Sequence, residues 1–576
     1  MNERVWVVDD APSRRFPIYT RGNVGEVFPD VVSPLSWSAY GGEAELGWRE
    51  AWRDYGVLLD RDVQEDNKVI IGCFGGYAYL NASYIRVFAV RTPGINVADM
   101  DALFFGDSAA PPYRQHAGDK SVAASLRIGR TILTTLSAKA LPELEDDKQR
   151  VRAWLTSLPD PTTASDQDLL GVATGFRPLF RHLYRRHILT TFRVFIGSGV
   201  LAQICERKLG DPTLITPLLS GIGSVESAEP SWAMWRLARM AADDPAIAAV
   251  FDAGVDDIES RLEAEPAAAA FRQGLTAFLD DFGSRGPNEW EGSSPTWGTA
   301  PRLALAAIDR MRVADAAHDP ELQHRRLRAE REAATGAARA RLPGLTRAQF
   351  DRAVRSTHLF SQGRERSKTT IIRAIHGLRL AQLELARRAR ERGGPDDLAD
   401  MWLLTLDELG DYVAAPEGFK AVIDERRQQR NELGSLVPPF VFEGVQPPVS
   451  TWEHRDRPVD LLGPGSVLRG IPGCPGLARG RARVVLDPFD PRGLAPGEVL
   501  VAPITDPSWT PLFLAAEAVV VDVGAQMSHA VIVSRELGIP AVVSATGATN
   551  VIPDGAEIEV DGTAGLIRVL GLDNGL

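Results

Sequence analysis

A histidine at the start of a predicted helix is the residue of this sequence best placed for chemistry. Residues 521–543 read VDVGAQMSHAVIVSRELGIPAVV, which predicts a buried strand ending at Val523, a loop, and a helix beginning near His529 with Ser528 as its N-cap. The helix dipole keeps the imidazole neutral and nucleophilic there, and the same backbone N–H groups favour an attached phosphoryl group. A histidine that accepts and releases phosphate needs both features, although these residues by themselves favour a structural histidine. The alternative is a histidine that only caps the helix.

Two cations stand four residues apart in a second segment, GRERSK at residues 363–368. On a helix Arg364 and Lys368 share one face, where both can contact one phosphoryl group and stabilise the charge that develops on its oxygens during transfer. The alternative is a solvated helix face on which Arg364 has only a structural partner. No pair of histidines or carboxylates has metal-ligand spacing such as HExxH, so we expect no metal site and do not favour a metal-dependent hydrolase.

A third candidate pair, Arg285 and Glu289, flanks Gly286-Pro287, which predicts a turn rather than a helix. A positioned arginine beside a carboxylate could bind a substrate and accept its hydroxyl proton. The alternative is a structural ion pair across the turn. Both interpretations remain open on sequence alone.

The elements that must position these residues change in character near residue 445. Before that point, apolar residues recur with helical spacing. Residues 70–82, IIGCFGGYAYLNA, are instead predicted to be extended. The stretches with helical spacing include residues 230–242, 246–282, 301–340, 346–392 and 395–409. We therefore expect a largely helical substrate-binding region over residues 1–442.

A segment rich in proline and glycine at residues 443–470 is predicted to be an extended linker. Short runs of Val, Ile and Leu follow it, separated by Gly- and Pro-bearing turns, with one helix predicted at residues 529–537. The predicted strands are residues 482–486, 499–502, 518–523, 541–544, 557–560 and 566–570. The sequence thus predicts a multidomain chain, mainly α-helical in its N-terminal and central region, with a C-terminal α/β domain at residues 471–576.

Composition narrows the functional class. The 576 residues carry a formal net charge of −12, which disfavours nucleic acid or an anionic membrane as a partner. We find no run of about 18 apolar residues and no signal peptide. The three cysteines are far apart and form no CxxC pair, which favours a reducing, cytoplasmic location.

Residues 473–569 resemble the swivelling phosphohistidine domain of phosphoenolpyruvate-utilising enzymes. The similar pieces are PGLARGRARVV at 475–485, GEVLVAPITDPSW at 497–509, SHAVIVSRELGIPAVV at 528–543 and DGAEIEVDGTAGLI at 554–567. The resemblance implies that His529 is the phosphorylated nucleophile and that Ser528 and Thr505 belong to the phosphate loop. Ala525 is one departure, because the family commonly has a second glycine there.

Much of residues 15–440 resembles the helical domain of rifampin phosphotransferases. The similar pieces are YTRGNVGEVFPDVVSPLSW at 19–37, FGSRGPNEWEGSSPTWGTAP at 282–301, GRERSK at 363–368 and IIRAIHGLR at 371–379. The resemblance implies catalytic roles for Arg364 and Lys368, and substrate binding by Arg285 and Glu289. Ser284 stands where the family usually has histidine, so the substrate hydroxyl would have to be deprotonated differently.

Enzymes of this kind charge their histidine from ATP bound in an ATP-grasp domain, and we find no such domain and no GxxxxGK[ST] loop in the sequence. The resemblance therefore implies a subunit of a split dikinase-type phosphotransferase, similar to phenylphosphate synthase. We expect no cofactor on this chain, ATP and Mg²⁺ on an ATP-grasp partner, and a small-molecule hydroxyl or carboxylate as acceptor. The alternative is a non-catalytic binding or regulatory protein that retains the fold.

Overall fold

The computed structural model describes residues 5–63, 70–105, 110–223, 229–314, 319–455, 459–488, 493–495, 497–524 and 528–572. The chain forms two compact units. The first comprises Met1–Ile196, Trp290–Ser293 and Arg366–Pro458, and the second comprises Gly197–Glu289, Ser294–Glu365 and Val459–Leu576. The predicted division into a helical region at residues 1–442, a linker at 443–470 and an α/β domain at 471–576 stays a prediction.

The first unit is built on a small antiparallel sheet in the order β2-β3-β1-β5. Its strands are β1 (Ile18–Thr20), β2 (Ile71–Phe74), β3 (Tyr77–Asn81) and β5 (Val441–Glu443). The extended segment predicted at residues 70–82 is confirmed as the β2–β3 hairpin. Its turn uses Gly75 and Gly76 at φ of 56° and 80°, a backbone region that glycine occupies without steric cost.

Helices surround this sheet, and aromatic side chains fill the core between them. Trp52 stacks on Tyr84 and meets Phe88 and Phe192. The helices of this unit are α1 (Val24–Val27), α2 (Pro34–Ser36), α3 (Gly42–Tyr55), α4 (Ala82–Arg91), α5 (Val97–Phe105), α6 (Val122–Ser137), α7 (Pro142–Thr156), α17 (Leu409–Ala414) and α18 (Lys420–Gly434), with parts of the long helices α8 (Asp166–Leu209) and α16 (Gly344–Glu391). Short pairing of β4 (Leu436–Val437) with β6 (Glu453–His454) completes it.

Helix α8 qualifies as a membrane span by length and composition, in contrast to the expectation that no stretch would. Within the described residues it is the one helix that passes, with a mean hydropathy of 1.6 over its 18-residue window and 56% of that window buried inside the protein. Phe192 lies in this helix and contacts Trp48, Trp52 and Phe88. A buried core helix passes the same test, so the finding is weak support for a membrane span.

The second unit contains an eight-stranded sheet in the order β7-β14-β13-β9-β10-β11-β12-β8. Strands β9 to β12 run parallel to their neighbours in that series, and the flanking strands are antiparallel. The strands are β7 (Val467–Arg469), β8 (Ile471–Cys474), β9 (Leu477–Val484), β10 (Glu498–Ala502), β11 (Ala518–Val521), β12 (Ala541–Val543), β13 (Glu557–Asp561) and β14 (Leu566–Gly571). This confirms the predicted C-terminal α/β fold.

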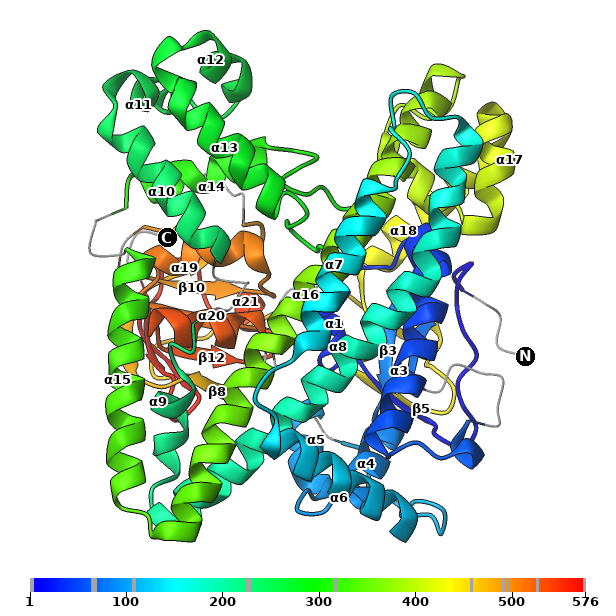
Figure 1. Cartoon of the computed structure of the whole chain (residues 1–576). Coiled ribbons are helices and arrows are strands. Elements are labelled where there is room, and N and C mark those ends of the chain that lie inside the picture. The colour runs from blue at the N-terminus through cyan, green and yellow to red at the C-terminus, as the bar shows by residue number, and fades with distance from the viewer. Residues whose placement is uncertain are drawn as a thin grey trace. The chain divides into compact units, whose positions relative to one another are not determined.

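Helices pack on both faces of this sheet. Helices α19 (Thr510–Ala515) and α20 (His529–Leu537) share one apolar core with helical residues from the middle of the chain, whereas α21 (Ala548–Val551) lies in the core of the opposite face. Figure 1 shows α19 beside α14 and α20 beside α15. The helices from the middle of the chain are α9 (Ile215–Leu219), α10 (Glu229–Asp243), α11 (Pro245–Asp252), α12 (Ile258–Ala264), α13 (Ala269–Phe282), α14 (Arg302–Arg312) and α15 (Pro320–Ala340).

Three stretches with helical spacing are divided into shorter elements. Residues 301–340 form α14 and α15. Residues 246–282 form three helices, because Asp257 adopts a left-handed φ of 52° and Pro266 begins a new turn after Glu265. Residues 395–409 form mainly 3₁₀ turns at Leu398–Leu403 and Leu406–Glu408. The spacing of apolar residues does not show where the backbone breaks such a stretch into shorter elements.

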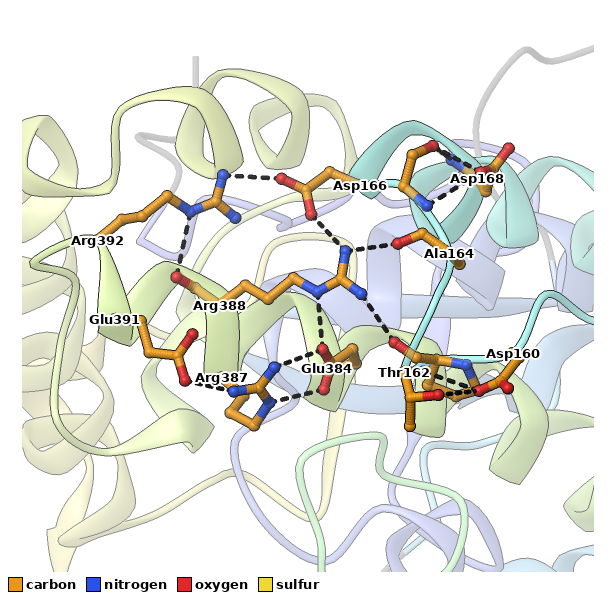
Figure 2. Close-up of polar contacts among 12 residues, drawn as sticks. Asp160, Thr162, Ala164, Asp166, Asp168, Glu384, Arg387, Arg388, Glu391 and Arg392 are labelled. Atoms are coloured by element: carbon orange, nitrogen blue, oxygen red, sulfur yellow. Dashed lines mark hydrogen bonds and ion pairs between the residues drawn. The ribbon is translucent and has the colours of Figure 1, made fainter.

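A network of ion pairs and hydrogen bonds ties the end of α16 to the start of α8 and the segment just before it, within the first unit (Figure 2). Arg388 donates to Asp166, to the Ala164 carbonyl and to Glu384 at 2.9, 2.8 and 2.7 Å. Arg392 also contacts Asp166, at 2.8 Å. Glu384 accepts from Arg387 as well, and this hydrogen bond lowers the pKa of Glu384 to about 2.

We expect Glu384→Gln to reduce stability at neutral pH by about 1 kcal/mol, the scale of a networked surface ion pair. The folded pKa of Glu384 is below its ordinary value, so the stabilisation is present above pH 4.5 and is lost as the pH falls toward 2. Urea unfolding at pH 7, 5 and 3 should show wild type and variant converging. Glu391→Gln, which removes a more exposed partner of Arg387, is the control and should matter less. A difference that does not shrink with pH would contradict this account.

Candidate active site

The predicted helix start is confirmed at His529. This residue begins α20, and the Ser528 side chain accepts a hydrogen bond from the Val531 N–H at 3.4 Å. Gly538 ends the helix with a φ of 67°, the left-handed conformation that glycine adopts readily. The preceding strand ends at Val521 rather than Val523. Ala525 lies outside the described residues.

Two threonine hydroxyls flank the imidazole of His529, which is partly exposed. Thr505 Oγ1 lies 3.3 Å from Nδ1 and Thr510 Oγ1 lies 3.5 Å from Nε2. Phe513 contacts the ring edge-to-face at 5.9 Å. Because a hydroxyl can donate or accept, the pair can hold either neutral tautomer and fixes the plane of the ring. Thr510 was not singled out from the sequence, although it directly follows the TDPSW motif.

The loop that carries Thr505 is organised by Asp506. Asp506 Oδ1 accepts from the N–H of Ser508 at 2.8 Å and from its hydroxyl at 2.5 Å, which stabilises a turn at residues 506–509. Oδ2 accepts from the Asn288 N–H at 2.9 Å, a contact that the sequence did not indicate. Burial raises the pKa of Asp506, and the negative charge of nearby Glu289 acts in the same direction.

Arg285 and Glu289 form a buried ion pair in the loop at residues 283–289. Arg285 Nε lies 2.6 Å from Glu289 Oε2, and each side chain is 2% exposed. The Trp297 N–H donates to the Arg285 carbonyl at 2.8 Å, which closes the loop. The pairing across a turn is thus present, and through Asn288 the same loop contacts Asp506 in the second unit. Substrate binding by this pair stays a prediction.

Arg364 and Lys368 lie one turn apart on α16, as the sequence predicted. Arg364 is paired with Glu365 at 3.3 Å, and its side chain is 17% exposed. It therefore does not lie on a freely solvated face. Arg364 belongs to the second unit and Lys368 to the first. Their catalytic roles stay predictions.

A histidine that sequence reasoning missed lies beside the same motif. His187, on α8, has its Nδ1 2.9 Å from the hydroxyl of Ser367, the residue before Lys368. Its ring also meets Trp290 and Tyr184, with centroid distances of 6.2 and 6.4 Å. These residues all belong to the first unit. A local signal was lacking, because His187 is 180 residues from Ser367 in sequence.

Two further histidines, His358 and His376, flank the GRERSK motif and are largely buried. His358 Nε2 lies 2.8 Å from the Leu218 carbonyl, and burial lowers the pKa of His358. Burial and the neighbouring Arg379 lower the pKa of His376 to about 3. Among the described residues, no group of three or more His, Cys, Asp and Glu side chains could hold a metal ion.

Two parts of the chain match known protein families. Residues 494–565 match the mobile domain of PEP-utilising enzymes, and residues 186–365 match the rifampicin phosphotransferase fourth domain. The first match contains His529, and the second contains Arg285, Glu289 and Arg364. The chain is therefore similar to PEP-utilising enzymes in their mobile, swivelling domain, and more particularly to rifampicin phosphotransferase.

Individual relatives extend this similarity along most of the chain. An uncharacterized protein of Mycobacterium tuberculosis is 35% identical over 97% of this chain and 62% of its own length. The prodigiosin synthesizing transferase PigC of Serratia marcescens is 26% identical over 98% of this chain and 64% of its own length. Rifampicin phosphotransferase of Streptomyces sviceus is 30% identical over 63% of this chain and 42% of its own length. The chain spans less than two thirds of each relative.

Proposed function

We propose that this chain carries a phosphoryl group on His529 and delivers it to a small-molecule hydroxyl or carboxylate. The observation that carries the proposal is the position of His529 at the start of α20, inside the match to the mobile domain and between two threonine hydroxyls. Backbone N–H groups at a helix start favour a dianionic group, and the neutral ring is nucleophilic.

The proposed chemistry has two balanced steps. In charging, a ring nitrogen of His529 attacks phosphorus, the P–N bond forms, and the P–O bond to the donor breaks with its electrons going to the donor oxygen. In delivery, the acceptor oxygen forms a new P–O bond and loses its proton, the P–N bond breaks, and the ring nitrogen recovers its electron pair. A protonated ring nitrogen is a good leaving group, so the carrier can release what it has accepted.

On the acceptor side we propose that Arg364 and Lys368 neutralise the oxygens of the transferring phosphoryl group. Arg285 and Glu289 would bind the acceptor. Ser284 stands where the resemblance expects a histidine, so another base has to take the hydroxyl proton. His187 suits that role, because Ser367 orients its ring next to the motif that contains Lys368.

The donor proposed here is ATP bound with Mg²⁺ to an ATP-grasp protein, with no cofactor on this chain. The family resemblance supports this donor. The small-molecule acceptor is supported by the names of two relatives, a rifampicin phosphotransferase and a prodigiosin synthesizing transferase. We also propose a cytoplasmic location, since Cys73, Cys205 and Cys474 are buried free thiols.

One observation favours a second candidate, a non-catalytic binding or regulatory protein. Ser284 is 7% exposed in the place of the expected histidine, so the acceptor side could have lost its base. The intact setting of His529 argues against this candidate. Charging of His529 separates the two functions, because a binding protein would not need it.

We expect the isolated chain to acquire no phosphate from ATP, and an added ATP-grasp protein to restore charging of His529. The measurement uses ATP radiolabelled at the β-phosphate, with the chain alone and with the ATP-grasp protein, followed by acid treatment, since phosphohistidine is acid-labile. AMP and inorganic phosphate should appear only in the complete mixture, as the dikinase resemblance implies. Strong acid-labile labelling of the isolated chain would show that it holds its own nucleotide site.

A further inference from the structure

The carboxylate of Asp506 divides its two oxygens between two loops of the second unit. Oδ1 accepts from the N–H and the hydroxyl of Ser508, inside its own loop. Oδ2 accepts from the N–H of Asn288, 218 residues away in sequence, at 2.9 Å. Oδ1 therefore stabilises the turn at residues 506–509, whereas Oδ2 makes a contact outside this turn.

Each of these loops carries residues already placed at the candidate site. Asp506 directly follows Thr505, whose hydroxyl lies 3.3 Å from His529 Nδ1. Asn288 directly precedes Glu289, the buried partner of Arg285. Asn288 itself has a left-handed φ of 46°, a conformation that asparagine tolerates better than most residues. We call the loop that carries Thr505 and Asp506, next to His529, the phosphohistidine loop. The hydrogen bond between Asp506 and Asn288 joins it to the loop at residues 283–289, which holds the Arg285–Glu289 pair.

The charges around this contact indicate that it fixes the position of the phosphohistidine loop rather than stabilising the fold as a whole. A buried carboxylate is costly unless hydrogen-bonded, and the negative charge of Glu289 acts against a second one nearby. The Asn288 N–H offsets part of this cost only while the two loops touch. If the phosphohistidine domain swings away, water can again solvate the Asp506 carboxylate, and the negative charge of Glu289 no longer lies beside it. The contact therefore stabilises the docked position of the loop, and leaving that position removes the charge repulsion with Glu289.

We infer that Asp506 is a positioning residue that docks the phosphohistidine loop on the loop at residues 283–289 through the Asn288 N–H, and thereby favours delivery over charging. The role in delivery rests on the proposed function, whereas the docking itself does not. A docked carrier must leave this position to reach a donor. Loss of the contact should therefore slow delivery and leave charging unchanged or faster, since the docked population falls.

The first test measures docking without any phosphoryl transfer. Amide hydrogen exchange of the full chain should rise roughly 10- to 100-fold in peptides covering residues 283–289 for Asp506→Ala, the range expected for losing a hydrogen bond to a charged group. Ser508→Ala is the matched control, because it removes a hydrogen bond to the other oxygen of the same carboxylate and should leave this peptide near wild type. Asp506→Asn keeps an acceptor oxygen and should exchange more slowly than Asp506→Ala. Equal exchange at residues 283–289 in wild type and Asp506→Ala would overturn the inference.

The second test separates delivery from charging, with the full chain and an ATP-grasp protein. Asp506→Ala should be charged at least as fast as wild type but should deliver phosphate to acceptor roughly 10-fold more slowly. Slowing of both steps by the same factor would indicate a damaged loop and overturn the inference. If wild type itself is not charged, the proposed function fails while the exchange result still decides the docking.

Discussion

Replacement of His529 by alanine is expected to abolish phosphate incorporation and turnover. The ring nitrogen forms the phosphoryl bond, and the neighbouring hydroxyls of Thr505 and Thr510 are much weaker nucleophiles than a neutral imidazole. The fold should persist, because the ring is partly exposed and the helix is capped by Ser528 and Gly538. Intact-mass measurement after incubation with ATP and the ATP-grasp protein should show a phosphorylated wild type and an unmodified variant.

His454→Ala is the control for this experiment, because His454 is an exposed histidine of the first unit. It should be charged like wild type. Undiminished labelling of His529→Ala would mean that phosphate is carried elsewhere. Circular dichroism of both variants should match wild type, which separates loss of the nucleophile from loss of the fold.

The second large effect is expected at Arg364 and Lys368. Either alanine variant should still be charged at His529, but transfer from the phosphorylated enzyme to acceptor should slow by roughly 100- to 1000-fold, since one contact to the developing phosphoryl charge is lost. Single-turnover decay of the phosphorylated enzyme with acceptor present measures this step. The Arg364→Ala result needs more care than the Lys368→Ala result, because removing Arg364 also breaks its ion pair with Glu365.

Arg390→Ala controls for loss of an arginine on the same helix, since Arg390 lies near the end of α16 and is exposed. Its decay rate should equal that of wild type. Lys368→Arg offers a further comparison, because it keeps the charge and changes the geometry. If the phosphorylated form of both alanine variants decays at the wild-type rate, Arg364 and Lys368 have only a structural role on the helix.

The predicted elements with local signals were confirmed closely. Helix α20 begins at His529 and ends at Leu537 as predicted, because Ser528 directly precedes the helix and Gly538 directly follows it in the sequence. The six predicted strands of the α/β domain are present within a few residues of the expected bounds. Strands β7 and β8 were missed, because they are short, flank glycine and proline, and gain stability only from pairing with β14 and β12.

By itself, then, the sequence determined the helix that bears His529, the spacing of Arg364 and Lys368, and the turn between Arg285 and Glu289. Each depends on residues within a few positions of one another, whose geometry follows from backbone periodicity and turn chemistry. Only the tertiary structure decided that Asp506 meets Asn288 and that His187 meets Ser367, across 218 and 180 residues. Contacts of that range depend on how whole elements pack, and no local pattern of side chains encodes them.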